Sequence, residues 1–251
     1  MSRLGRHNNS IKKVLIVFCS MCILQMAKAQ NGFEIRQISE HNFIYVTYQN
    51  IDSSPYPANG MFIITKPGII LLDSPWDTTQ AELLIDSMER MYKAKVIACI
   101  ATHFHADRTG SLDILKRRGI KTYSSHQTND LCKMHGEPQA EFYFESDTTF
   151  TFGNFNVKTF YPGKGHSPDN IVIWLEEGKV LYGGCFIKST ESETLGNLGD
   201  ADVPAWLVSI GNIKRSLPKP EIVISGHQSF SADLCLDYTL RLVKRHLSEN
   251  K

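Results

Sequence analysis

The sequence predicts an α/β fold in which two mixed β-sheets pack face to face and helices cover both outer faces, an αββα four-layer sandwich. Three observations support this prediction. Segments with strand-like and helix-like patterns follow the order strands, helix, strand, helix in each half of the chain. Residues 95–101 form an almost unbroken apolar run, which is typical of a strand buried on both faces of a sheet. The helical segments are apolar along one side only, as expected of helices that cover a sheet.

The first 29 residues have the pattern of an export signal. Basic residues precede an apolar run at positions 14–26, and Ala27-Lys28-Ala29 has the small-x-small form of a signal-peptidase site. The run is shorter than the about 20 apolar residues that a transmembrane helix needs, and an uncleaved anchor is the alternative. We therefore expect a signal peptide over residues 1–29 that is cleaved after Ala29, export to the periplasm, no stable membrane association, and one domain over residues 30–251.

Charge and cysteine content restrict the possible partners. Of the 27 Lys and Arg residues, five lie in the predicted signal peptide, which leaves 22 against 26 Asp and Glu residues and a net charge of −4. A net negative charge implies no basic face to which a nucleic acid would bind. Four cysteines remain after cleavage, and their wide spacing leaves open whether Cys132 and Cys235 form a disulfide.

In the first half, alternating apolar residues predict strands between positions 33 and 48. Residues 49–60 are rich in turn formers and predict a loop, whose Ile51 and Tyr56 either pack locally or contact a substrate. A helix that starts near Asp77 has apolar residues at the i, i+3, i+4, i+7 spacing. The other predicted elements are strands at 61–65, 68–72, 95–101 and 121–124 and helices at 111–119 and 128–135. The strands on either side of the helix near Asp77 should pair in parallel.

The second half begins with strand-like alternation over residues 142–161, with turns at Asp147 and at Gly153-Asn154. Two further strands, at 171–175 and 179–182, form a hairpin about Glu177-Gly178. Asp202 then caps a helix that has Pro204 in its first turn. A strand at 221–225 and a closing helix with an apolar stripe over 236–247 complete the half.

The strongest chemical signal follows the buried strand at 95–101. His103, His105 and Asp107 stand at alternate positions in the turn between this strand and the next helix. Open α/β sheets bind ligands outside the carboxyl ends of their strands, and imidazole and carboxylate groups suit zinc. A lone His-x-His is a weak signal, and a polar loop whose histidines cap the helix is the alternative interpretation.

Three later junctions between a strand and a loop present further zinc-type ligands, namely His166, Cys185 and His227. Each is a weak signal alone, but four such junctions in one chain are hard to obtain by chance. The six candidates divide into a three-imidazole set (His103, His105, His166) and a mixed set (Asp107, Cys185, His227). Both sets leave a position open for water, which is typical of catalytic rather than structural zinc. Zinc-bound water ionises with a pKa of about 7.

At these residues the chain resembles the metallo-β-lactamase superfamily, whose signature is His-x-His-x-Asp. Most hydrolases of the superfamily have a second His after the Asp and a bridging Asp between the metals, whereas this chain has Arg108 and Cys185. That departure resembles the class B β-lactamases of the subclass with three-His and Asp-Cys-His zinc sites. The resemblance extends from about Phe33 to the last helix.

The resemblance implies two Zn2+ ions per chain and hydrolysis of the β-lactam amide bond of penicillins, cephalosporins and carbapenems, which would confer antibiotic resistance. It implies a small-molecule β-lactam substrate, no nucleic-acid partner and a monomer. Lys188 matches the lysine that binds the substrate carboxylate. Asn197 matches an asparagine that binds substrate and acts in catalysis near the developing oxyanion, and a turn residue beside glycines is the alternative interpretation.

The same resemblance gives roles to residues around the ligands. Asp107 would act in catalysis by orienting the second metal and the water. Asp73, Thr102 and Arg108 look like residues that orient the ligands. Gln228 stands where the family often has glycine.

Two other functions fit the same ligand set. A thioesterase or phosphodiesterase of the same superfamily is the first, and Arg108 and Cys185 argue against it. A non-catalytic periplasmic zinc-binding protein is the second. Turnover separates it from an enzyme, because the six ligands would bind metal in either case.

Overall fold

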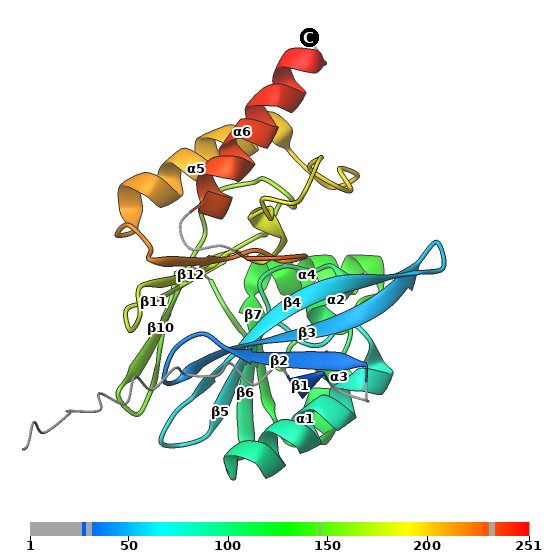
Figure 1. Ribbon diagram of the computed structural model, residues 1–251, viewed down its shortest axis with the longest axis vertical. Helices are drawn as coiled ribbons and strands as arrows, with labels where there is room; N and C mark the ends of the chain where they lie inside the picture. The colour runs from blue at the N-terminus through cyan, green and yellow to red at the C-terminus, as the bar shows by residue number, and fades with distance from the viewer. Residues whose placement is uncertain (1–26, 29–31, 146, 231–233, 251) are drawn as a thin grey trace, which may run out of the picture.

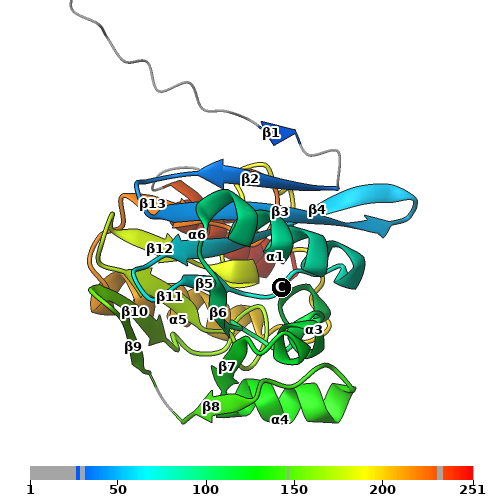
Figure 2. The same cartoon turned by 90° about the horizontal axis from the view of Figure 1, so that it is seen from below.

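Two β-sheets stack face to face at the centre of the molecule, and helices lie on both outer faces (Figures 1 and 2). The computed structural model describes residues 27–28, 32–145, 147–230 and 234–250. Within these residues the larger sheet has eight strands in the order β1 to β8, and the smaller sheet has the order β13-β12-β11-β10-β9. The predicted αββα sandwich is therefore confirmed.

The strands of the larger sheet are β1 (Ala27–Lys28), β2 (Phe33–Gln37), β3 (Asn42–Ile51), β4 (Ser54–Ile64), β5 (Ile69–Leu72), β6 (Val96–Ile100), β7 (Lys121–Ser125) and β8 (Phe142–Phe144). Those of the smaller sheet are β9 (Thr149–Phe152), β10 (Phe155–Phe160), β11 (Val172–Leu175), β12 (Val180–Tyr182) and β13 (Ile222–Ile224). The longer helices are α1 (Thr78–Tyr92), α4 (His126–His135), α5 (Val203–Ser216) and α6 (Leu234–Glu249). Short helices are α2 (Ala106–Thr109), α3 (Leu112–Arg117) and the 3-10 turn η1 (Gly184–Phe186).

Three apolar clusters separate the four layers. One lies between the sheets and joins residues such as Met61 and Ile100 of the larger sheet to Val157 and Ile173 of the smaller one. A second joins the larger sheet to α1 and α3, and a third joins the smaller sheet to α5 and α6. Full burial of one such side chain contributes about 1.5–3 kcal/mol, so the cluster between the sheets stabilises the docking of the two halves.

The predicted pairing and the predicted helix starts are also confirmed. Strands β5 and β6, on either side of α1, pair in parallel, whereas β4 and β5 form the antiparallel hairpin. Asp77 accepts a hydrogen bond from the Thr79 backbone N–H at 2.7 Å, and Asp202 accepts one from Ala205 at 2.9 Å. These caps satisfy backbone donors that a helix start leaves unpaired.

The predicted loop over residues 49–60 is wrong, because this segment is a β-hairpin. Strand β3 continues to Ile51 and β4 begins at Ser54, with Asp52 and Ser53 at positive φ (49° and 67°) in the turn. Pro55 and Pro57 are tolerated in β4 because its pairing with β5 begins only at Met61, so their missing N–H groups leave no ladder bond unmade. Figure 1 shows the hairpin projecting from the body of the protein.

Two further expectations concern the N-terminus and the cysteines. The predicted cleavage point after Ala29 and the apolar run at 14–26 lie outside the described residues. No helix in the described ranges is long and apolar enough to cross a membrane. Cys99, Cys132 and Cys185 are free thiols, and Cys235 is buried like the other three, so Cys132 and Cys235 do not form a disulfide with each other.

Candidate metal centre

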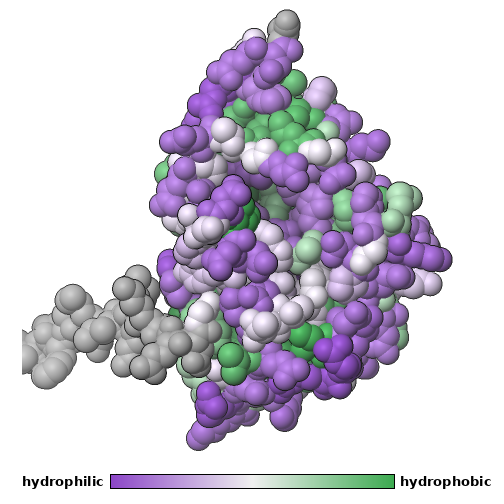
Figure 3. Space-filling model, turned by 90° about the vertical axis from the view of Figure 1, so that its right-hand side faces the viewer, coloured by the Kyte–Doolittle hydropathy of each residue, from purple (hydrophilic) through white to green (hydrophobic). Residues whose placement is uncertain are grey.

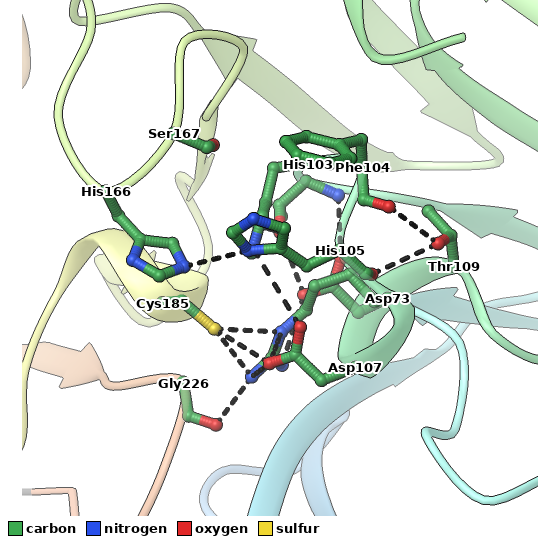
Figure 4. Close-up of polar contacts among 12 residues, drawn as sticks. Asp73, His103, Phe104, His105, Asp107, Thr109, His166, Ser167, Cys185 and Gly226 are labelled. Atoms are coloured by element: carbon green, nitrogen blue, oxygen red, sulfur yellow. Dashed lines mark hydrogen bonds and ion pairs between the residues drawn. The ribbon is translucent and has the colours of Figure 1, made fainter. Parts of the chain in front are cut away.

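The His-rich motif lies at the carboxyl end of β6, where the sequence places it. Helix α2 begins immediately after His105, which is its N-cap residue. Ligand atoms of His103, His105 and Asp107 all lie within 4.8 Å of one another. His103 and Asp107 are buried, and His105 is half-buried. The motif thus directs three side chains toward one point, as the close-up shows (Figure 4).

His166 completes a three-imidazole set from the other half of the chain. It lies in the loop after β10, and its Nε2 is 3.1 Å from His105 Nδ1, which in turn is 3.1 Å from His103 Nε2. The three rings are nearly perpendicular to one another, with interplanar angles of 80–90°. Three ring nitrogens that converge edge-on are a donor set for tetrahedral zinc with one open position.

A second set contains one carboxylate, one thiol and one imidazole. Cys185 Sγ lies 3.0 Å from Asp107 Oδ2 and 3.2 Å from His227 Nε2, and these two atoms are 3.1 Å apart. Cys185 belongs to η1 after β12, and His227 follows β13. Asp107 also faces the first set, since its Oδ1 is 3.9 Å from His103 Nε2. Each set combines ligands from both sheets, and all six residues predicted as ligands are brought together.

Whether these residues fit a metal can be judged from the hydrogen bonds of the histidine nitrogens that face away from the ligand sets. His227 Nδ1 is 2.8 Å from the Pro57 carbonyl, and His103 Nδ1 is 3.3 Å from Thr102 Oγ1. A carbonyl can only accept, so His227 Nδ1 carries the proton and leaves the Nε2 lone pair directed at the set. Hydrogen bonds of this kind orient histidine ligands in metal sites. The arrangement therefore fits zinc.

Burial and charge set the protonation of the ligands. Burial lowers the pKa of His103, His166 and His227, so these imidazoles are neutral and able to bind a metal. Burial alone would raise the pKa of Asp107, but Arg108 and His227 outweigh it, and that pKa lies well below its usual value. Burial raises the pKa of the Cys185 thiol although Arg108 opposes the shift. Zinc binding at this set would therefore release the thiol proton.

Arg108 joins the mixed set to the surrounding backbone. Its side chain is 1 % exposed, and it donates hydrogen bonds to Asp107 Oδ2 at 3.1 Å and to Cys185 Sγ at 3.1 and 3.2 Å. Its other N–H groups donate to the backbone carbonyls of Asn59 at 2.6 Å and Gly226 at 2.7 Å. A planar guanidinium with five donors suits such a fixed set of acceptors better than an ammonium.

Asp73 holds the first turn of the His-rich motif. Its carboxylate accepts hydrogen bonds from the Thr102 N–H at 2.6 Å, the Thr102 hydroxyl at 3.0 Å and the Tyr182 hydroxyl at 2.6 Å. Burial raises its pKa to about 6, although Arg108 and these hydrogen bonds lower it. The Thr102 hydroxyl also contacts His103 Nδ1. Thr102 therefore links Asp73 to a ring nitrogen of a predicted ligand. Asp73, Thr102 and Arg108 all lie where the predicted orienting role requires.

Gly226 allows the ends of two neighbouring strands of the smaller sheet, β12 and β13, to lie close together at the mixed set. A Cβ built on this residue would lie 2.6 Å from the Cys185 nitrogen and 2.6 Å from the Gly184 carbonyl carbon. Both neighbours are backbone atoms, which cannot move aside as a flexible side chain can. Only glycine therefore lets the strand end that carries His227 pass beside the turn that carries Cys185.

Lys188 and Asn197, the predicted substrate-binding residues, have different surroundings. Lys188 is 8 % exposed and lines a cavity of about 100 Å³ together with Tyr56, Ser192 and His227. Asn197 is exposed, and its Oδ1 accepts a hydrogen bond from the Gly199 N–H at 2.9 Å within its own turn. The roles of both residues stay predictions. Seen from the side toward which the β3–β4 hairpin projects, the surface is mainly hydrophilic and is hollowed near its middle (Figure 3).

The sequence interpretation missed one residue at the centre, Asp200. Its Oδ2 lies 3.0 Å from His105 Nε2, on the side of the ring opposite the ligand set. It stands in a turn-rich segment before α5, and nothing in that segment distinguishes it from a loop carboxylate. The general expectation that a metal-binding histidine has a carboxylate partner is the only signal that could have pointed to it.

Comparisons with known proteins agree with this geometry. Residues 54–227 match the family model of the metallo-beta-lactamase superfamily. Metallo-beta-lactamase type 2 of Bacillus cereus is 39% identical over 221 residues (88% of this chain, 86% of the relative), and that of Elizabethkingia meningoseptica is 34% identical over 218 residues (87% and 88%). The solved structure of a metallo-beta-lactamase from Pontibacter korlensis has a TM-score of 0.82 and 30% identity, over 84% of this chain and 99% of that one. The chain therefore belongs to the metallo-β-lactamase superfamily, among its class B enzymes.

Proposed function

We propose that this protein is a zinc-dependent β-lactamase that hydrolyses the β-lactam amide bond of penicillins, cephalosporins and carbapenems. The observation that carries the proposal is the pair of open ligand sets joined by Asp107, with Lys188 beside them in a small cavity. The protein acts as a monomer in the periplasm after removal of residues 1–29, and it confers antibiotic resistance there.

Two zinc ions would be held, one by His103, His105 and His166 and the other by Asp107, Cys185 and His227. When bound, they lower the pKa of a water molecule to about 7 and polarise the lactam carbonyl. Asp107 contributes more than a ligand atom. Its two oxygens face different sets, so the carboxylate can orient the attacking water between them.

The remaining roles belong to side chains that meet the substrate. Lys188 binds the substrate carboxylate, because its ammonium lines the cavity next to His227. Asn197 donates from Nδ2 to the carbonyl oxygen as that oxygen gains charge, and its Oδ1 is already engaged by Gly199. Arg108 stays behind the mixed set and keeps Asp107 and Cys185 oriented.

Hydrolysis of a carbapenem by the chain from residue 30, followed by loss of ultraviolet absorbance, tests the activity. We expect turnover that disappears with a chelator and returns with zinc. Cys185→Ser should lower both zinc content and rate, whereas the control Cys235→Ser, at a buried position of α6, should change neither. Absence of turnover by protein shown to hold two zinc ions would overturn the β-lactamase function and leave a zinc-binding protein or a thioesterase.

Export and resistance need a cellular test. A sensitive bacterium that expresses the full chain should grow at a higher β-lactam concentration than one that expresses the chain without residues 1–29. Equal growth of the two strains, with equal enzyme levels, would contradict the periplasmic location.

A further inference from the structure

The ammonium of Lys188 is largely buried and has an aromatic partner instead of an anionic one. Its Nζ lies 5.4 Å from the ring centroid of Trp206, over the face of the ring. Among the described residues no carboxylate lies within ion-pair distance of this ammonium, which is unusual for a lysine that is only 8 % exposed. The backbone at Lys188 is held by Thr239 of α6, whose hydroxyl accepts from the Lys188 N–H at 2.8 Å.

The ring of Trp206 is itself fixed. It is fully buried, and its Nε1–H donates to the Phe186 carbonyl at 3.1 Å. Its backbone lies in the first turn of α5, where its N–H donates to the Asp202 carbonyl at 2.8 Å. The ring also packs near His166, with 6.0 Å between the ring centroids. One rigid side chain therefore contacts both a ligand of the three-imidazole set and the predicted carboxylate anchor.

An aromatic ring holds a cation in a way that a carboxylate cannot. The negative face of the indole attracts the ammonium but leaves its positive charge uncompensated. A carboxylate partner would instead compete with the substrate for the same charge. A free lysine would have to lose the rotational freedom of its long side chain when the substrate binds.

We propose that Trp206 is a positioning residue that holds the Lys188 ammonium at a fixed distance from the three-imidazole set for the carboxylate of the substrate. The proposal rests on the substrate-binding role proposed above for Lys188. Trp206 does not touch the substrate, and its contribution passes through Lys188. Loss of the ring's negative face therefore weakens binding of carboxylate-bearing substrates and leaves the chemical step unchanged.

Fluorinated tryptophan incorporated at position 206 tests this without removing the buried ring. Fluorine withdraws charge from the face of the indole and keeps its shape and its N–H, so the fold is preserved. The measurement is KM and kcat for a carbapenem acid and for its methyl ester, which lacks the anionic carboxylate. With tetrafluorotryptophan we expect KM for the acid to rise about three- to thirty-fold, while its kcat, the KM of the ester and the zinc content stay unchanged.

Two controls separate positioning from packing. The same replacement at Trp174, another buried tryptophan of the second half, should leave KM and kcat unchanged for both the acid and the ester. In a Lys188→Met background, tetrafluorotryptophan at 206 should no longer change KM for the acid. Equal effects on acid and ester, or an undiminished effect in the Lys188→Met background, would overturn the positioning role.

The experiment also distinguishes failure of the inference from failure of its premise. If Lys188→Met alone leaves the acid-to-ester ratio of KM unchanged, the substrate-binding role of Lys188 is wrong, and the role of Trp206 falls with it. If Lys188→Met raises that ratio but fluorination at 206 does not, only the role of Trp206 is wrong.

Discussion

Arg108 donates two hydrogen bonds to the sulfur of Cys185, from Nε at 3.2 Å and from Nη2 at 3.1 Å. The guanidinium is buried and also contacts Asp107, so a fixed positive charge lies directly behind the mixed ligand set. This charge favours the thiolate and the carboxylate, which are the forms that bind a metal.

Replacing Arg108 by lysine should weaken the mixed set more than the three-imidazole set. The ammonium keeps the charge but cannot contact the sulfur, the carboxylate and two backbone carbonyls together. We expect one zinc ion to bind about 10–100 times more weakly, as measured by chelator competition. The surface substitution Arg118→Lys is the control. Unchanged affinity for both ions would show that Arg108 does not orient the set.

Gly226→Ala should disturb the same set from the opposite side. The new Cβ would press on backbone atoms of Gly184 and Cys185 at 2.6 Å, so the two strand ends must separate. We expect a loss of about 1–3 kcal/mol in unfolding free energy, measured with urea, together with weaker zinc binding. The control Gly211→Ala lies in α5 and should stabilise the protein by about 0.5–1 kcal/mol. Equal stability of the two variants would contradict the close approach.

Asp200→Asn tests the carboxylate that the sequence did not reveal. The amide keeps the size of the side chain but removes the negative charge beside His105 Nε2. A less strongly polarised imidazole binds zinc more weakly, and we expect about tenfold lower affinity at the three-imidazole set. Asp113→Asn, at an exposed ion pair with Lys116, is the matched control. A tenfold loss in the control as well would point to a general effect of charge.

The metal-free protein should lose stability as the pH falls below about 6.5. His103, His166 and His227 have folded pKa values below the unfolded value, so their contribution is complete above about 6.5 and is lost when the unfolded chain takes up protons. Burial raises the pKa of Asp73 to about 6 and also raises the pKa of Asp169 and Glu137, so these carboxyls oppose the histidines wherever they stay protonated in the folded chain. We expect the three histidines to dominate near pH 6, so that the net slope there is positive.

Urea unfolding of the metal-free protein between pH 5.5 and 7.5 measures this slope. His166→Asn should reduce the slope of unfolding free energy against pH by up to about 1.4 kcal/mol per pH unit, which corresponds to one proton. His246→Asn, near the end of α6, serves as the control. A flat or falling profile would show that these histidines are not buried in the neutral form.

Most elements were predictable because their signals are local. The apolar run of β6, the spacing of apolar residues in α1 and the caps Asp77 and Asp202 each depend on neighbours in the sequence. The β3–β4 hairpin was not predicted, because Pro55, Pro57 and the turn formers lie in the outer part of β4, which pairs with β3 but not with β5. Local composition does not reveal which strand edges are free.

The same distinction between local and long-range signals applies to the residues of the metal centre. The ligands could be proposed because each follows a strand, and strand ends meet at one edge of a sheet. The pairing of Asp200 with His105, 95 residues apart, and of Lys188 with Trp206, 18 residues apart, depends on how the chain between η1 and α5 folds over that edge. Neither residue pair has a spacing that marks it as a contact.

Both ligand sets draw their members from the two sheets, so metal ions bound there would cross-link the two halves. A chain cut between β8 and β9 would give two fragments, of which one retains His103, His105 and Asp107 and the other His166, Cys185 and His227. Neither fragment would keep a complete set of either kind. Enzymatic activity is thus possible only in the fully assembled domain, so selection for activity is at the same time selection for correct docking of one sheet on the other.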